Sequence, residues 1–266
     1  MTPTIEMTAP ALFISHGAPT FALEPGVLGA RLAEIGPALD AVQAVLVVSP
    51  HWQTRGLVVS AAMQPETLHD FGGFPAPLYA LHYPAPGAPQ VAQEVADTLS
   101  AAGWPVTIDA HRGLDHGAWV PLLHLRPQAD IPVLQLSMPF SLDAAAALAL
   151  GQALRPLRDM GIAIAGSGSM THNLGEFRGP GLPEQPYVRA FAQWMHERVI
   201  TRDLQALADY RSLAPSAARA HPSDEHLLPL QVAVGATSAE EPATLLATEI
   251  RYGMLSMASY AWGLGR

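Results

Sequence analysis

The sequence predicts one α/β domain over residues 1–266, in which helices flank a largely parallel central sheet. Two observations support this fold class. Short apolar runs such as Ala11–Ser15 and Ala44–Ser49 alternate with longer segments of helical periodicity, as expected for strands covered on both faces. No linker or internal repeat divides the chain, and its length fits a single domain. In such folds the active site lies at the carboxyl-terminal edge of the strands.

The remaining elements follow from the same patterns. Further strands are predicted at Leu57–Ser60, Pro105–Asp109, Pro132–Ser137, Ile162–Ala165, Ala243–Ile250 and Met254–Trp262. Helices are predicted at Leu28–Val42, Val91–Ala102, Leu142–Met160, Pro186–Tyr210 and Glu225–Val234. Ser141 is the candidate N-cap of the helix that Gly161 ends. Thr67–Gly87 is rich in Gly, Pro and aromatic residues, which predicts a long loop.

Composition excludes several classes of function. The formal net charge is −9, and the 14 basic residues form no cluster, so nucleic-acid binding is not expected. The apolar stretches are too short, or too interrupted by Pro and Gly, to span a membrane, and the first residues do not resemble a secretory signal. We therefore expect a cytoplasmic protein. The absence of cysteine excludes disulfides, thiolate metal ligands and cysteine nucleophiles. The oligomeric state is not defined, and a homo-oligomer remains open.

Three of the 11 histidines follow apolar strands directly. His16 ends the run ALFIS, His51 follows AVLVVSP, and His172 follows IAIAGSGSMT. Because parallel strands end at one edge of a sheet, residues distant in the sequence converge there. Histidine is the commonest metal ligand and titrates near neutral pH. The pattern therefore predicts a metal-dependent enzyme built on a histidine cluster.

A fourth candidate is the polar segment His221–His226, which precedes an apolar helix. Either His226 or Glu225 is expected to be a metal ligand, although an acidic residue at a helix start is also an ordinary capping pattern. Gly166–Ser169 is interpreted as a tight turn that leads to His172. It has neither the P-loop spacing and lysine nor the G-x-S-x-G pattern of serine hydrolases.

Two further segments are candidates for substrate contacts. In Arg112–Gly117, the glycines allow close approach of a ligand, and His116 is a candidate contact, although such a loop is equally compatible with a simple turn. His69 lies in a second Gly-rich loop and is a weaker candidate.

Several motifs together resemble one enzyme family. They are Ser15–Thr20 (SHGAPT), Ser49–Trp52 (SPHW), His69–Pro75 (HDFGGFP), Tyr83–Gly87 (YPAPG), Arg112–Leu122 (RGLDHGAWVPL), Ser167–Leu174 (SGSMTHNL) and His221–Leu230 (HPSDEHLLPL). In this order they extend over most of the chain and resemble the class III extradiol ring-cleavage dioxygenases, in particular the DOPA 4,5-dioxygenase branch. The resemblance implies a single α/β domain and one mononuclear divalent metal, with Fe(II) expected for catalysis and Zn(II) also found in bacterial members.

The matching motifs also imply roles for individual residues. His16, His51 and His226 would be the metal ligands, and His172 would be an acid/base beside the metal or a fourth ligand. Ring-cleaving iron enzymes usually bind the metal through two histidines and one carboxylate, so Glu225 is the alternative ligand.

The resemblance places one further residue in the substrate pocket, and the sequence itself offers others as candidates. His116 would line this pocket and assist proton transfer. Arg112 is the candidate partner of a substrate carboxylate, and His69 and Phe71 are further candidate contacts. Phe71, with Phe74, Tyr79 and Tyr83, would form an aromatic wall, although loop packing also explains these aromatics.

The implied reaction is O₂-dependent opening of a catechol such as DOPA to a muconic semialdehyde. Two alternatives remain open. The same histidines could hold Zn²⁺ and activate a water molecule in a hydrolase. A fully coordinated ion would instead indicate a non-catalytic metal-binding interaction module.

Overall fold

Four parallel strands form the centre of the sheet in this computed structural model, which describes residues 8–177, 179, 181 and 183–265. They are β5 (Val133–Pro139), β2 (Ala44–Thr54), β6 (Ile162–Gly168) and β1 (Ala11–Ser15), in that spatial order. Each adjacent pair is parallel. The central strands are buried on both faces, which explains their continuous apolar sequences.

Antiparallel pairs extend the sheet on both sides of this centre. The outer strands are β3 (Leu57–Ser60), β4 (Val106–Asp109), β10 (Ser259–Trp262) and β7 (Thr244–Ala247). The described part of the chain gives the order β4-β3-β5-β2-β6-β1-β10-β7, in which β3 is antiparallel to β5 and β10 is antiparallel to β1 and β7. The predicted α/β class with a largely parallel sheet is therefore confirmed.

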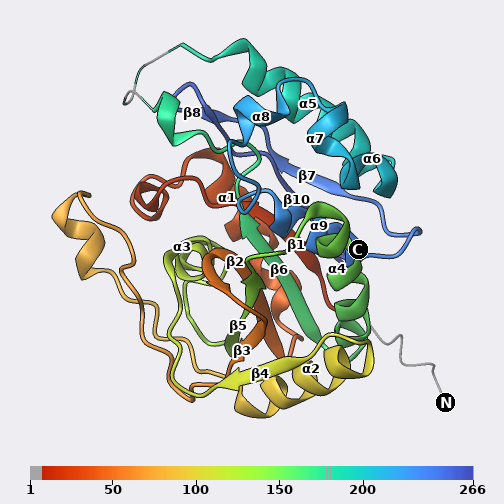
Figure 1. Cartoon of the computed structure of the whole chain (residues 1–266). Coiled ribbons are helices and arrows are strands. Elements are labelled where there is room, and N and C mark those ends of the chain that lie inside the picture. The colour runs from red at the N-terminus through yellow and green to blue at the C-terminus, as the bar shows by residue number, and fades with distance from the viewer. Residues whose placement is uncertain (1–7, 178, 180, 182, 266) are drawn as a thin grey trace.

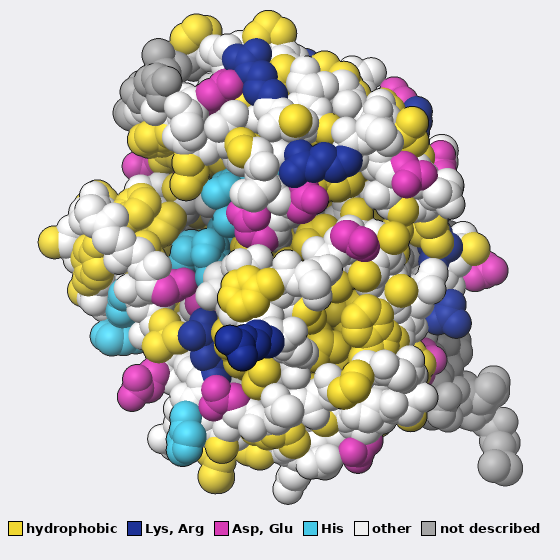
Figure 2. Space-filling view, viewed as in Figure 1, with side chains coloured by type: hydrophobic (Ala, Val, Ile, Leu, Met, Phe, Trp, Pro, Cys, Tyr) yellow, Lys and Arg dark blue, Asp and Glu magenta, His cyan; other side chains and the backbone are white. Residues whose placement is uncertain are grey.

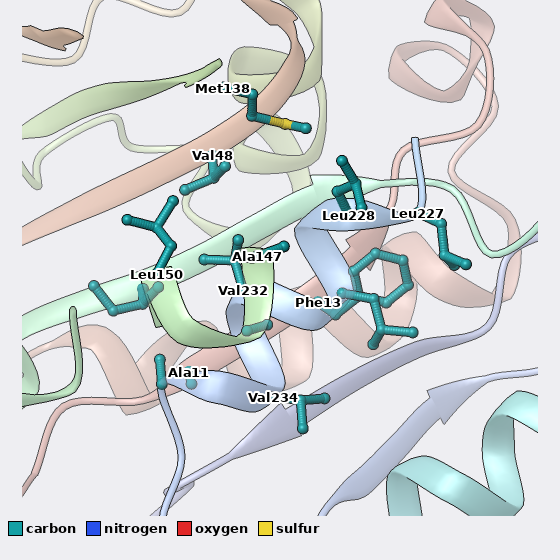
Figure 3. Close-up of a cluster of buried hydrophobic side chains, with 14 of the residues drawn as sticks. Ala11, Phe13, Val48, Met138, Ala147, Leu150, Leu227, Leu228, Val232 and Val234 are labelled. Atoms are coloured by element: carbon teal, nitrogen blue, oxygen red, sulfur yellow. The ribbon is translucent and has the colours of Figure 1, made fainter. Parts of the chain in front are cut away.

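Alternate residues of the central strands face two separate cores. On β1, Ala11 and Phe13 belong to one buried cluster, whereas Leu12 and Ile14 belong to the other. Residues of α2 (Pro89–Ala101), α4 (Ala144–Asp159) and α9 (Leu228–Gly235) complete the first cluster, part of which is shown in Figure 3. Residues of α1 (Gly26–Ile35) and α3 (His116–Leu125) complete the second. Helices therefore cover both faces of the sheet (Figure 1).

The segment between β6 and α9 forms a group of helices at the top of Figure 1. They are α5 (Pro186–Ile200), α6 (Leu204–Ala208), α7 (Tyr210–Leu213) and α8 (Ala217–Ala220). The predicted single helix over Pro186–Tyr210 is wrong, because the chain breaks after Ile200. Arg202 has φ +52°, and the Asp203 side chain caps α6 by accepting a hydrogen bond from Ala206 N.

Other predicted boundaries also need correction. The N-cap of α4 is Asp143, which accepts from Ala146 N, and not Ser141. Gly166–Gly168 belong to β6 and are not part of a tight turn. The helix predicted from Glu225 begins instead at Leu228, and α3 was not predicted. Short 3₁₀ helices are η1 (Pro19–Ala22), η2 (Gly36–Leu39), η3 (Ala76–Ala80) and η4 (Leu174–Glu176).

Two short strands, β8 (Ile250–Arg251) and β9 (Leu255–Ser256), form a hairpin beside the main sheet. Its turn contains Tyr252 and Gly253, both with positive φ, as in the hairpin turns that match strand twist. None of the helices in the described residues has the length and hydropathy to cross a membrane.

Candidate metal centre and substrate cavity

The central strands bring histidines to one edge of the sheet. Ser15 pairs with Gly168, so β1 and β6 end side by side, and His16 and His172 follow them. His51 lies in β2 where the pairing with β5 shifts between Val48 and Gln53. This irregularity lets the strand bend towards the site. The predicted convergence at the carboxyl-terminal edge therefore occurs.

His226 reaches the same edge from the segment before α9. Its carbonyl oxygen accepts a hydrogen bond from Ser169 N at 2.8 Å, which joins this segment to the end of β6. A Cβ atom on Gly168 would lie 2.2 Å from that carbonyl oxygen. Only glycine permits this approach, so the small residue after Ser167 places His226 close to the sheet.

His116 enters the cluster as the first residue of α3. Asp115 caps this helix and is fully buried, where its carboxylate accepts from Ser49 Oγ at 2.8 Å and from Gln135 Nε2 at 2.7 Å. Burial raises the pKa of Asp115, whereas these hydrogen bonds oppose the rise. The cap therefore connects α3 to β2 and β5 and holds His116 at the strand ends.

Five histidine rings form one cluster. The Nε2 atoms of His16 and His51 are 3.1 Å apart. Ring centres are separated by 5.1 Å for His16 and His51, 5.1 Å for His51 and His226, and 5.7 Å for His16 and His226. Two pairs are closer. His116 lies 3.8 Å from His51, and His172 stacks on His226 at 3.5 Å with an interplanar angle of 9°.

Hydrogen bonds determine which nitrogen of three rings is free. The hydroxyl of Ser167 donates to the Gly117 carbonyl, so it accepts from Nδ1–H of His16 at 2.9 Å. The Glu225 carboxylate accepts from Nδ1–H of His226 at 3.1 Å. Asp70 accepts in the same way from Nδ1–H of His116 at 3.0 Å. Each of these Nε2 atoms therefore keeps its lone pair.

Four of the five rings, those of His16, His51, His172 and His226, are neutral at pH 7. Burial lowers the pKa of His16 and of His226 well below the ordinary value, and the neighbouring histidines lower both further. Burial likewise lowers the pKa of His51 to about 3 and that of His172 to about 4. Neutral imidazoles are the form that binds a metal ion, so the electrostatics favour metal binding over protonation.

A cavity of about 710 Å³ opens onto the cluster. Figure 2 shows histidine side chains in a recess between a protruding segment and the body of the molecule. The cavity is lined by Gly17, Ala18, Pro19, Thr20, Glu24, His51, Phe71, Gly72, Gly73, Phe74, His116, His172, Leu174, Phe177, His226, Tyr252 and Leu255. This volume and mainly apolar wall suit a small aromatic ligand.

Two of the three predicted substrate contacts do not line the cavity, and of the predicted metal ligands His16 and Glu225 lie behind its wall. Arg112 lies 3.4 Å from the Asp115 carboxylate and stacks over the Trp52 ring at 5.1 Å. His69 lies behind Phe71, with ring centres 5.8 Å apart, and its Nε2 is 3.0 Å from the Leu81 carbonyl oxygen. Phe71 is in the wall, as predicted.

The aromatic wall differs in part from the prediction. Phe74 lines the cavity, but Tyr79 and Tyr83 do not. Thr20, Tyr252 and Phe177 line it instead and were missed. Tyr252 lies in the β8–β9 turn, far from the histidine motifs in the sequence. The Tyr-Gly pair of that hairpin was the only local signal, and it predicts a turn without indicating a cavity.

Comparison with known proteins identifies the family. The family described as the catalytic LigB subunit of aromatic ring-opening dioxygenase matches residues 10–263. The chain belongs to this family. The LigB-family chain is 39% identical to the 4,5-DOPA dioxygenase extradiol of Beta vulgaris, over 93% of its own length and 94% of the relative's. It is also 39% identical to the protein of that name from Escherichia coli strain K12, with 96% and 94% covered.

A solved structure supports the same assignment. The crystal structure of an uncharacterized protein from Escherichia coli K12 superposes with a TM-score of 0.77 at 34% identity, covering 95% of this chain and 99% of the other. Together with the histidine cluster, these findings make the LigB-family chain a metal-dependent extradiol ring-opening dioxygenase.

Proposed function

We propose that this enzyme uses O₂ to open a catechol such as DOPA to a muconic semialdehyde, with one Fe(II) ion held by His16, His51 and His226. The observation that carries the proposal is that the centres of these three rings lie 5.1–5.7 Å from one another, with His51 and His226 in the cavity wall. The names of the relatives, which are DOPA dioxygenases, support the choice of substrate.

Ring spacing favours this ligand set over others in the cluster. Two imidazoles that bind one ion through nitrogens at about 2 Å have ring centres roughly 5 Å apart, because their nitrogens converge. The three pairs among His16, His51 and His226 lie at 5.1–5.7 Å. The pairs His51–His116 and His172–His226 lie at 3.8 Å and 3.5 Å, too close for both rings to bind the same ion. His116 and His172 are therefore assigned to the substrate.

In this proposal the Glu225 carboxylate is not a metal ligand, as it would be in a site of two histidines and one carboxylate. Its oxygen accepts from His226 Nδ1–H, which orients the ring and makes its Nε2 more basic. Three neutral nitrogens leave coordination positions open, as catalysis requires. When bound, the metal supplies a Lewis acid for the catechol oxygens and, as Fe(II), a path for electrons to O₂.

The surrounding residues bind the catechol and move its protons. His172 is neutral at pH 7, because burial lowers its pKa to about 4, so it can accept a proton from a substrate hydroxyl. Asp70 accepts from the backbone N–H and from Nδ1–H of His116, which aims the other ring nitrogen at the cavity. Phe71 and Phe74 contribute apolar surface against which the aromatic ring packs and water is excluded.

Reconstitution with defined metals tests the proposal. Metal-free protein is loaded anaerobically with Fe(II) or Zn(II), mixed with DOPA and then with O₂. Oxygen uptake and the visible absorbance of the semialdehyde are expected with iron only, because zinc has no accessible redox change. If the iron form shows no oxygen uptake and no product with any of a panel of catechols, the proposal is contradicted. Ester or amide hydrolysis by the zinc form would then indicate a hydrolase, and a water-free, fully coordinated ion would indicate a binding module.

A further inference from the structure

We propose that the cavity selects catechols whose ring substituent carries an ammonium group over those whose only charged substituent is a carboxylate, and that Glu24 provides this selection. The inference rests on the proposed function, because it assumes that the catechol oxygens face the histidines. The substituent on the opposite side of the ring then extends towards the outer part of the cavity.

Glu24 belongs to the same stretch of chain as His16. After Gly17, the chain enters η1, and the N–H groups of Leu23 and Glu24 both donate to the Thr20 carbonyl at 3.0 Å and 2.9 Å. This turn places Thr20 and Glu24 together in the cavity wall. The Glu24 carboxylate is exposed and makes no hydrogen bond or ion pair with the residues that the structure describes. It is therefore free to bind a ligand.

No arginine is among the described residues that line the cavity. Arg251, next to Tyr252, is 3.9 Å from the Glu249 carboxylate and packs over the Phe21 ring. Arg112 pairs with Asp115 outside the cavity. A substrate carboxylate near Glu24 would therefore meet a like charge, and neither arginine nor lysine is among the described residues of the wall to offset it.

Two hydroxyl groups could also contact the ammonium group. The Thr20 and Tyr252 hydroxyls are 2.9 Å apart and both residues line the cavity with Glu24. Hydroxyl oxygens accept hydrogen bonds from an ammonium group. Tyr252 has φ +52°, a backbone conformation that residues with a side chain rarely adopt. The β8–β9 turn holds it there, which fixes the position of the hydroxyl at the cavity wall.

Three ligands of matched size test the inference. Dopamine carries an ammonium group on a two-carbon chain, 3,4-dihydroxyphenylpropionate carries a carboxylate on the same chain, and 4-ethylcatechol is the neutral reference. Dissociation constants are measured by calorimetry on the Zn(II)-loaded protein, which cannot turn the ligands over, and kcat/KM is measured on the Fe(II)-loaded protein. We expect dopamine to bind more tightly than the propionate, by a ratio that falls as salt is added.

The matched variants are Glu24→Gln and Glu34→Gln. Glu34 is also exposed, but it pairs with Arg31 and does not line the cavity. Glu24→Gln should lower the dopamine-to-propionate affinity ratio about fivefold, the upper range for an exposed charge pair, whereas Glu34→Gln should leave the ratio unchanged. Equal binding of both ligands by the wild type, or an unchanged ratio in Glu24→Gln, would overturn the inference.

Failure of the proposed ring opening and failure of the proposed charge selection give different results in these experiments. If the iron form opens no catechol while the zinc form still prefers dopamine through Glu24, the proposed reaction is wrong and the binding preference holds. If the iron form opens dopamine and the propionate with equal kcat/KM, and the zinc form binds them equally, ring opening holds and the charge selection is wrong.

Discussion

At the scale of single residues, His172 is the proposed acid/base, and its substitution tests whether proton transfer is separate from metal binding. It stacks on His226 at 3.5 Å, which holds its ring beside the proposed ligands. We predict that His172→Ala lowers kcat for ring opening about 10²–10⁴-fold, the usual contribution of a general acid or base. The metal dissociation constant should stay within a few-fold of the wild type. A large loss of metal affinity would show instead that His172 is a ligand.

The hydrogen bond between Glu225 and the proposed ligand His226 gives a second prediction. Glu225 accepts from His226 Nδ1–H, and removing this acceptor frees the ring to rotate and lowers its basicity. We predict that Glu225→Ala weakens metal binding about 10–100-fold, measured by competition with a chromogenic chelator. Glu197→Ala, at an exposed position on α5, is the control and should bind metal as the wild type does. An unaltered affinity in Glu225→Ala would refute this positioning role.

At the scale of elements, the contact between β6 and the segment before α9 sets the position of His226. A Cβ on Gly168 would lie 2.2 Å from the His226 carbonyl oxygen, so Gly168→Ala must push the two apart. We predict overpacking that costs about 1–3 kcal/mol of unfolding free energy, together with weaker metal binding. Gly56→Ala, where an added Cβ meets nothing within 4 Å, is the control. Destabilisation without any change in metal affinity would contradict the link to His226.

The elements also show what the sequence could and could not predict. Strands β1, β2 and β6 were predictable, because burial on both faces makes their sequences continuously apolar. Helix α3 was missed, because it is buried nearly all round, so its sequence has no amphipathic period, and it contains Pro121. The break after Ile200 was missed, because neither Gly nor Pro marks it and Arg202 adopts the left-handed conformation instead.

The same limit applies to the site. The histidines that follow the strands were predictable from topology, since parallel strands end at one edge. The pairing of Arg112 with Asp115, and the place of Tyr252 in the cavity wall, depend on tertiary contacts that leave no local pattern. Nor could the sequence distinguish Glu225 as a ligand from Glu225 as the acceptor for His226, because the two are adjacent.

At the scale of the whole molecule, metal binding should stabilise the fold. The five clustered histidines come from distant parts of the chain, so the site exists only in the folded state. A metal present at a thousand times its dissociation constant adds about 4 kcal/mol, which raises Tm by roughly 10 °C for a chain of this size. Scanning calorimetry with and without chelator measures this shift. His51→Ala should abolish most of it, and an undiminished shift would place the metal elsewhere.

The most direct test of ring opening is the stoichiometry of the reaction. Fe(II)-loaded protein is supplied with DOPA, and the O₂ consumed, the hydrogen peroxide formed and the product mass are followed together. A dioxygenase consumes O₂ and catechol in equal amounts, forms no peroxide, and gives a product heavier than DOPA by two oxygen atoms, or by two oxygen atoms less one water where the new aldehyde condenses with the amine. Formation of peroxide with a quinone of lower mass would show that the histidine cluster oxidises the catechol without opening its ring.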